Sequence, residues 1–239
     1  MLKNILRRMA QRVLGFDRYL FVFSIFNINR IRVLKAEKAF RFFMGMVPNE
    51  GAILDIGANI GINTVLLAKR FPGAVVHAFE PVQENYAALE KTVRFYGVRN
   101  VRLYNTALGD TPGQATMIMP QHHGSRMQGW SRMTDGKEVN GTGFVVPVAR
   151  LDDIRGISNI TAIKIDVENF EYFVLKGGTE TLRNNKPIVF CELWNDARKE
   201  PCLQLMRGLG YEAKILVNGR LVQYNGEDVL DYFFVHKGD

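Results

Sequence analysis

Three acidic residues end apolar runs of the sequence, at positions where a parallel α/β sheet would present them to a ligand. Asp55 lies at the end of "AILDI", Glu80 at the end of "AVVHAFE" and Asp166 at the end of "ITAIKID". In an open α/β sheet, ligands bind at the carboxyl ends of the strands. Carboxylates at that edge can orient a cationic group, accept hydrogen bonds from ribose hydroxyls, take a proton or hold a divalent cation.

The turn after Asp55 favours a ligand without phosphate. Its spacing is D-x-G-x-x-x-G, with Gly57 and Gly61, so it lacks the second glycine of the dinucleotide pattern G-x-G-x-x-G. Asp55 would repel a pyrophosphate, whereas S-adenosylmethionine carries a sulfonium and an ammonium and no phosphate. Glu80, 25 residues further on, is placed to accept the ribose hydroxyls. Both acids have a structural alternative, Asp55 as a helix cap and Glu80 as an ordinary strand-end acid.

Residues that could accept a proton lie in two segments. In "KIDVENFE" Asp166 and Glu168 alternate with apolar residues as the strand ends, although capping of the following helix is an alternative for both. In "HHGS" the neutral pKa of imidazole makes His122 or His123 a candidate base. Adjacent histidines are also common in solvated loops and occasionally bind metals. We expect no metal site.

The apolar runs alternate with helical segments from residue 51 onward, which is typical of a mostly parallel sheet covered by helices on both faces. After Gly210 two "NG" turns, Asn218-Gly219 and Asn225-Gly226, favour hairpins and an antiparallel end to the sheet. The expected strands span residues 52–56, 74–80, 101–108, 160–166, 187–193, 211–217, 220–225 and 230–236, and the expected helices span residues 62–71, 82–97, 169–185 and 196–210.

A long connection at residues 109–153 interrupts this alternation. It contains two strand-like pieces, residues 114–120 and 143–149, around a polar stretch rich in Gly and Ser. Connections of this length are usually functional or disordered. We expect a substrate-facing insertion over the carboxyl ends of the strands, with an inert loop as the alternative.

Positive charge is confined to the first 50 residues. They hold ten basic and three acidic residues, which is the whole surplus of +7 in the 239-residue chain. Leu2, Ile5, Leu6, Met9 and Val13 have helical spacing, and Lys3, Arg7, Arg8 and Arg12 fall largely on other sides. This basic amphipathic helix can bind an anionic membrane peripherally, or pack on its own domain with a solvated basic face.

The remaining composition excludes several classes of protein. No recognition motif or basic stripe elsewhere favours a nucleic-acid partner. Cys191 and Cys202 match no disulfide framework or metal pattern, so we expect free thiols in a reducing compartment, the cytoplasm. No run reaches the roughly 20 apolar residues that span a bilayer, and "YLFVFSIF" lacks the cleavage site of a signal peptide.

Several motifs in succession resemble the FkbM family of class I S-adenosylmethionine-dependent methyltransferases. They are "ILDIGANIGINT", "HAFEPVQENYAALEKTV", "NTALGD", "VARLDDI", "IKIDVENFEYFVLKGG" and "PIVFCELW", from about Ala52 to Trp194. The resemblance implies a Rossmann-like α/β fold with a seven-stranded, mostly parallel sheet and an antiparallel C-terminal hairpin. It also implies methyl transfer, most often to a hydroxyl of a sugar, glycan or secondary metabolite.

The resemblance also assigns residues to the cofactor. Asp166 would lie beside the transferred methyl group. Asn169 stands where the family usually has glycine, and asparagine tolerates left-handed backbone better than most residues. The methionine portion would contact Asp55, Gly57, Asn59 and Gly61, with Asn63 and Thr64 beside them, the ribose would contact Glu80 and Pro81, and the adenine would contact Ala107 and Leu108.

We therefore expect a basic helical extension at residues 1–48 and a methyltransferase domain at residues 49–239. A nucleotide-binding oxidoreductase and a catalytically silent cofactor-binding module on a membrane surface are the alternatives. The acceptor is expected to be a small molecule or a glycan. The sequence predicts neither its identity nor the oligomeric state.

Overall fold

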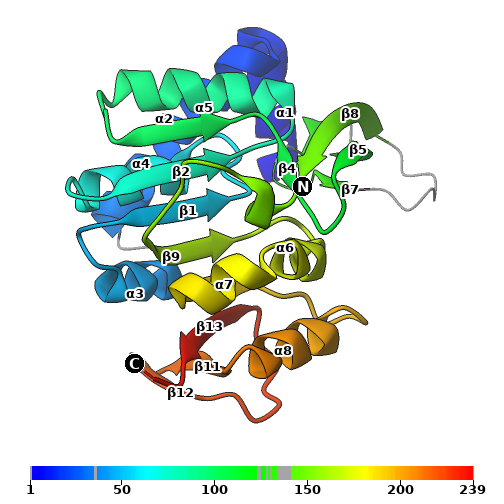
Figure 1. The fold of residues 1–239 in the computed structure, drawn as a ribbon. Coiled ribbons are helices and arrows are strands. Elements are labelled where there is room, and N and C mark those ends of the chain that lie inside the picture. Colours follow the sequence, from blue (N-terminus) through cyan, green and yellow to red (C-terminus); the bar gives the residue numbers. More distant parts are fainter. Residues whose placement is uncertain are drawn as a thin grey trace.

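A mixed sheet forms the centre of the protein in the computed structural model, which describes residues 2–34, 37–122, 125–127, 129, 131–133 and 141–238 (Figure 1). For residues 2–5, 34, 122, 125, 132 and 133 it describes the backbone alone. The strands of this sheet are β1 (Ala52–Ile56), β2 (Val75–Phe79), β3 (Val101–Tyr104), β9 (Ile160–Ile165), β10 (Ile188–Glu192), β11 (Tyr211–Val217), β12 (Arg220–Gln223) and β13 (Asp231–His236).

The strand order is β12-β11-β13-β10-β9-β1-β2-β3, and the strands from β10 to β3 are parallel. This is the class I methyltransferase-like α/β fold with an antiparallel C-terminal hairpin, as predicted. The sheet has eight strands where the family resemblance implied seven. The additional strand is β12, a half-exposed edge strand that the apolar pattern of residues 220–225 did predict.

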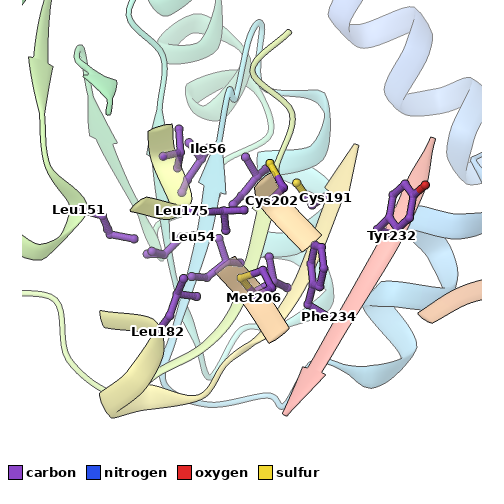
Figure 2. Close-up of a cluster of buried hydrophobic side chains, with 14 of the residues drawn as sticks. Leu54, Ile56, Leu151, Leu175, Leu182, Cys191, Cys202, Met206, Tyr232 and Phe234 are labelled. Carbon is purple, nitrogen blue, oxygen red and sulfur yellow. The ribbon is translucent and has the colours of Figure 1, made fainter. Parts of the chain in front are cut away.

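Helices cover both faces of the sheet because its strands alternate their side chains between the two sides. In β1, Ile53 packs with α2, α3 and α4, whereas Leu54 and Ile56 pack with α6, α7 and α8. Figure 2 shows the second of these clusters. The helices are α1 (Leu2–Leu14), α2 (Phe16–Leu34), α3 (Lys38–Met46), α4 (Ile62–Arg70), α5 (Gln83–Phe95), α6 (Glu171–Gly177), α7 (Thr179–Asn185) and α8 (Lys199–Gly208).

The two cysteines are free thiols, as predicted. Cys191 and Cys202 are buried in the cluster drawn in Figure 2. Burial raises the pKa of the Cys202 thiol to about 12 and that of Cys191 well above its usual value. Both are therefore core side chains with little thiolate character at neutral pH.

The predicted strand at residues 101–108 is divided between two sheets. The side-chain amide of Asn105 donates hydrogen bonds to the carbonyls of Glu80 and Pro81, at 2.8 and 3.1 Å, and turns the chain out of the main sheet after β3. The second sheet contains β4 (Ala107–Leu108), β5 (Gly113–His122), β6 (Ser125–Arg126), β7 (Arg132–Met133) and β8 (Gly141–Ala149).

The long connection contributes most of this second sheet, which lies beside the main sheet in Figure 1. Its two predicted strand pieces, residues 114–120 and 143–149, lie within β5 and β8, which pair antiparallel over their length. Residues 151–153 then form a single 3-10 turn before the chain re-enters the main sheet at β9. The role of the insertion as a substrate-facing element stays a prediction.

Only one of the two predicted "NG" hairpins is formed. Asn218 and Gly219 have φ values of 49° and 79° and join β11 to β12 in a tight turn, as predicted. The prediction for Asn225-Gly226 was wrong, because β13 pairs with β10 and β11 and not with β12. The fully buried side chains of Tyr232, Phe233 and Phe234 place β13 in the interior of the sheet.

The N-terminal segment is helical and packs on the rest of the chain through α2. The hydroxyls of Ser24 in α2 and Thr92 in α5 lie 2.7 Å apart in a buried hydrogen bond, and Leu20 and Ile28 are fully buried. The apolar stripe predicted on α1 is largely exposed to solvent, since Leu6 and Val13 are 57% and 81% exposed. No helix in the described part of the chain is long and apolar enough to cross a bilayer.

Candidate active site

A cavity opens at the carboxyl ends of β1, β2 and β9. This is the edge at which open α/β sheets bind their ligands. The cavity brings together most of the residues that the sequence assigned to the cofactor and adds side chains from the second sheet. It is lined by Ile56, Gly57, Asn59, Phe79, Glu80, Pro81, Asn85, Thr106, Ala107, Leu108, Met117, Gly129, Ser131, Asp166, Val167, Glu168 and Phe170.

The carboxylate of Glu80 is held by backbone N–H groups on both sides. Asn59 N–H donates to Oε2 at 2.8 Å, and Val82 N–H donates to Oε1 at 2.9 Å. Burial raises the pKa of Glu80 to about 7, against the lowering effect of these hydrogen bonds and of Lys164. Oε1 also accepts from Nδ2 of Asn85 at 3.4 Å, so Oε2 is the oxygen with a further lone pair for a ligand.

The charged residues of the cavity lining are acidic. Glu80, Asp166 and Glu168 belong to it, and none of its described residues is lysine or arginine. A phosphate group would meet like charge here, since Lys164 beside Asp166 compensates only part of it. The lining therefore suits a ligand that is neutral or positively charged.

Asp55 does not line this cavity or the second cavity described below. Its side chain is fully buried beneath the glycine turn, where Thr64 Oγ donates to Oδ2 at 2.6 Å. Its other oxygen, Oδ1, lies 3.3 Å from Nζ of Lys164. The expectation that the carboxylate of Asp55 faces the ligand thus differs from the structure, in which Lys164 compensates that charge internally.

The two glycines of the turn permit close packing. Gly57 has φ 77°, and a Cβ there would overlap the backbone carbonyl of Asp166, so β1 and β9 approach closely only because this side chain is absent. Gly61 has φ 86° and begins α4, and a Cβ there would lie 2.7 Å from Leu89 Cδ1. Gly57 lines both cavities, whereas Gly61 and Thr64 line neither.

The segment after β9 is a turn of unusual backbone that Glu171 stabilises. Glu168 and Asn169 have φ values of 50° and 72°, so asparagine does adopt the left-handed conformation that the family gives to glycine. Oε1 of Glu171 accepts the N–H groups of Val167 and Asn169, at 3.3 and 3.1 Å. Burial raises the pKa of Glu171 to about 7. This turn presents Asp166 and Glu168 to the cavity.

A second cavity, of about 270 Å³, adjoins the first. The two share Gly57, Asn59, Gly129 and Asp166 in their linings. Asn63, which the sequence assigned to the cofactor, lines only this second cavity. The remaining lining comes from α2, the start of α3, the glycine turn, the start of α4 and the sheet. It consists of Phe23, Asn27, Arg30, Ile31, Glu37, Phe40, Ala58, Ile60, Ile62, Lys164, Phe190, Glu192 and Asp231.

The two candidate histidines are not placed in either cavity. His122 ends β5, where its backbone pairs with Ser125, and the structure describes no more of it. His123 lies outside the described residues. Within the described part of the chain, no group of three or more His, Cys, Asp or Glu side chains could hold a metal ion. The roles of both histidines stay predictions.

Sequence reasoning gave no role to several residues of the site. Lys164 could have been found, because a lysine inside the apolar run "ITAIKID" has to be paired if it is buried. Asn85 gives no such signal, since it stands in an ordinary amphipathic helix. Its side chain is 1% exposed, and its Oδ1 has no hydrogen-bond partner among the described residues. Glu192 is the last residue of β10 and Asp231 is the first residue of β13. The sequence around them gives no sign of a functional role either.

Comparison of the sequence with known families identifies a match. Residues 55–213 match the family described as "Methyltransferase FkbM domain". Similar proteins include methyltransferase 1 of Beauveria bassiana, 26% identical over 147 residues, and 31-O-demethyl-FK506 methyltransferase FkbM of Streptomyces tacrolimicus, 30% identical over 152 residues. These matches cover 54% and 52% of this chain, and it spans 59% and 58% of the length of those relatives.

Solved structures support the same fold. Methyltransferase FkbM from Methylobacillus flagellatus has a TM-score of 0.55 at 15% identity, covering 97% of this chain and 60% of that one. An S-adenosylmethionine-dependent O-methyltransferase from Thermotoga maritima has a TM-score of 0.51 at 13% identity, covering 87% of this chain and 70% of that one. At these identities the likeness concerns the fold alone.

Proposed function

The chain belongs to the FkbM methyltransferase family, and on that premise we propose that it transfers a methyl group from S-adenosylmethionine to a hydroxyl oxygen of a sugar, glycan or secondary metabolite. The observation that carries the proposal is the acidic cavity at the strand ends, whose described lining has three carboxylates and no basic side chain. A sulfonium and an ammonium suit that lining, whereas the pyrophosphate of a nicotinamide cofactor does not.

The residues of the first cavity fit S-adenosylmethionine. Oε2 of Glu80 has a lone pair for a ribose hydroxyl, and Oδ1 of Asn85, which has no partner among the described residues, calls for a hydrogen-bond donor from a ligand. The apolar side chains of Phe79, Leu108 and Phe170 line the same space and offer a surface for a flat base. Asp166 and Glu168 are the acids available to the methionine ammonium and the sulfonium.

The chemistry assigns a short set of tasks to the protein. When bound, S-adenosylmethionine supplies a methyl group on a good leaving group. The protein aligns the acceptor oxygen behind that methyl, excludes water and removes the hydroxyl proton. Asp166 lines both cavities and so stands at the passage between donor and acceptor.

A relative supports an oxygen acceptor. The protein from Streptomyces tacrolimicus is named as a 31-O-demethyl-FK506 methyltransferase, so a hydroxyl acceptor occurs within the family. The second cavity, of about 270 Å³, supports an acceptor bound beside the donor, because its lining shares four residues with the donor cavity.

Calorimetry and mass spectrometry test the proposal. The protein is titrated with S-adenosylmethionine, S-adenosylhomocysteine and NAD, and we expect binding of the first two. It is then incubated with S-adenosylmethionine and a panel of monosaccharides, oligosaccharides and macrolides, with the mass of one added methylene unit as the readout. Heat with NAD alone would favour an oxidoreductase. Cofactor binding without any methylated product would favour a catalytically silent module.

We propose in addition that α1 contacts an anionic membrane surface. Leu6, Met9 and Val13 are exposed on it, beside the exposed Arg8 and Arg12. An exposed apolar stripe flanked by basic side chains is typical of helices that lie in the headgroup region. The charge of the first 50 residues supports this partner over an uncharged one.

A further inference from the structure

Three carboxylates lie side by side across neighbouring strands at the ligand edge of the sheet. Ile165 of β9 pairs with Cys191 of β10, so Asp166 and Glu192 follow as neighbours one residue later. Glu192 is in turn the register partner of Asp231 in β13. Residues paired across strands point to the same face. All three side chains line the second cavity, and Asp166 lines the first one as well.

The two cations around this row are paired with Asp166 and with acids outside the row. Lys164 Nζ lies 3.6 Å from Oδ2 of Asp166 and 3.3 Å from Oδ1 of Asp55. Arg30 pairs with Glu37 at 3.9 Å. Within the described residues, no ion pair or side-chain hydrogen bond involves the carboxylate of Glu192 or that of Asp231. These two acids therefore face the second cavity with their lone pairs available.

The surroundings of Glu192 favour the protonated form. Burial raises the pKa of Glu192 to about 7, and the charges of Asp166, Asp231 and Glu171 act in the same direction, while Lys164 opposes them. Burial raises the pKa of Asp231 as well, and Glu37 and Asp166 add to this effect. A carboxyl group that titrates near neutral pH is suited to general-base catalysis.

We propose that the second cavity is the acceptor site and that Glu192 is the general base that removes the proton of the acceptor hydroxyl. This inference rests on the proposed methyl transfer. The oxygen lone pair forms the new bond to the methyl carbon as the carbon–sulfur bond breaks, with its electron pair going to sulfur. The hydroxyl proton goes to a carboxylate oxygen of Glu192. Asp166, bound to Lys164, is then a positioning group at the junction of the two cavities.

The lining of the second cavity also selects the class of acceptor. Phe23, Phe40 and Phe190 provide apolar rings, and Glu192 and Asp231 provide hydrogen-bond acceptors for hydroxyl groups. An anionic acceptor would meet the two uncompensated carboxylates at short range. The acceptor is thus an uncharged ring compound with several hydroxyl groups, such as a glycosyl unit.

The first test needs no acceptor. The protein is labelled with ¹³C at the glutamate carboxyl carbons, and the signal that disappears in Glu192→Gln is followed as the pH is raised. We expect this signal to titrate near neutral pH, and to titrate at lower pH in Asp231→Asn, because removal of a neighbouring negative charge eases ionisation. Titration in the ordinary range of an exposed glutamate, or no response to Asp231→Asn, would overturn the proposal.

The second test uses the panel compound with the highest turnover. We expect Glu192→Gln to lower kcat/KM by about 100-fold, since general-base catalysis contributes at least that much. The wild-type kcat/KM is expected to rise through neutral pH, and Asp231→Asn is expected to move that rise to lower pH. Glu200→Gln, an exposed change on α8, is the matched control and is expected to keep the wild-type profile.

Failure of this inference is distinguishable from failure of the proposed function. If the wild type binds no S-adenosylmethionine and methylates nothing, the proposed function fails. If the wild type methylates an acceptor and Glu192→Gln does so at the same rate with the same pH profile, only the assignment of Glu192 fails. Titration with S-adenosylhomocysteine shows that Glu192→Gln retains the donor site, and a retained melting temperature shows that it folds.

Discussion

The ammonium nitrogen of Lys164 lies 3.3 Å from Oδ1 of Asp55, and both side chains are almost completely buried, at 4% and 0% exposure. The two residues are register partners of β9 and β1. Burial lowers the pKa of Lys164, but the charges of Asp55 and Asp166 outweigh this effect and leave its pKa above the usual value. Lys164 is therefore charged at neutral pH, and its ion pair with Asp55 connects two central strands beneath the glycine turn.

Lys164→Met is expected to reduce the free energy of unfolding by about 3–5 kcal/mol, because it leaves the buried carboxylate of Asp55 without its cation. Urea denaturation measures this loss. The double variant Asp55→Leu with Lys164→Met is expected to lose less than Lys164→Met alone, since no buried charge remains unpaired. The exposed pair of Lys176 and Asp110 offers a control, and Lys176→Met is expected to change stability far less. Equal losses for Lys164→Met and Lys176→Met would contradict this account.

Asp55→Asn distinguishes a structural from a ligand-binding carboxylate. Because Asp55 lines neither cavity, we expect the variant to be less stable but to bind S-adenosylmethionine with little change in affinity per folded molecule. Calorimetry well below the melting temperature of the variant measures that affinity. A large loss of affinity in a fully folded Asp55→Asn protein would instead support the direct contact between Asp55 and the cofactor that the sequence suggested.

Glu80 makes cofactor binding dependent on pH. Its pKa is raised to about 7 in the folded protein, and ribose hydroxyls donate best to the ionised form. Affinity for S-adenosylhomocysteine is therefore expected to rise about tenfold between pH 6 and 8, as one group of that pKa ionises. Calorimetry in two buffers of different ionisation enthalpy should register the released proton. A flat profile in the wild type, or an unchanged profile in Glu80→Gln, would refute this role.

The same raised pKa has a consequence for stability without ligand. The folded protein holds the proton of Glu80 more tightly than the unfolded chain does, whose glutamates titrate near 4.5. The favourable contribution is then fully present below that pH and is lost as pH rises towards 7. Urea denaturation at several pH values is expected to show Glu80→Gln losing less stability over this interval than the wild type. If the stability of the two proteins changes equally with pH, the pKa of Glu80 is not raised in the folded protein.

The local patterns of the sequence predicted the elements of the fold well. Short apolar runs predicted the strands, and single positions such as Asn169 and the Asn218-Gly219 turn have the backbone that their residue types favour. Those features depend on a few neighbouring residues. They can therefore be predicted without knowledge of which strands lie side by side.

The parts of the site that escaped prediction depend on pairing across long stretches of sequence. Asp55 reads as an exposed ligand-facing acid until Lys164, on the neighbouring strand, is known to lie against it. The second cavity joins α2, at the N-terminus, to Glu192 and Asp231 near the other end of the chain. Neither relationship leaves a periodic signal, because each arises from strand order and helix packing.

Asn85 is predicted to contact the cofactor. Its buried Oδ1 lacks a partner among the described residues, while its Nδ2 lies 3.4 Å from Oε1 of Glu80. Asn85→Ala is expected to weaken S-adenosylhomocysteine binding roughly tenfold, the value of one buried hydrogen bond. Asn100→Ala is the matched control, because Asn100 bonds three backbone carbonyls away from the cavity, those of Ala68, Phe71 and Ala74. It should lower the melting temperature and leave affinity intact. If Asn85→Ala and the wild type bind S-adenosylhomocysteine with equal affinity, Asn85 does not contact the cofactor.

The exposed stripe of α1 predicts selective binding to anionic vesicles. Leu6 and Val13 are apolar and largely exposed, and Arg8 and Arg12 are exposed on the same helix. Burial of the apolar side chains in the headgroup region and attraction of the arginines to anionic lipid both favour binding, with about 1 kcal/mol for each basic residue. We expect the 239-residue protein to sediment with phosphatidylglycerol vesicles and to remain in solution with phosphatidylcholine vesicles.

Two double variants separate the apolar from the electrostatic contribution of α1. Leu6→Gln with Val13→Gln removes the apolar contact, and Arg8→Gln with Arg12→Gln removes two charges, so each pair is expected to weaken vesicle binding about tenfold or more. Val145→Gln is the control, because Val145 is 68% exposed on β8 but has no place in α1. Added salt should release the wild type, since screening weakens the attraction between the arginines and the lipid headgroups. If both double variants sediment with the vesicles as the wild type does, α1 is not the element that binds lipid, and its exposed stripe needs another partner.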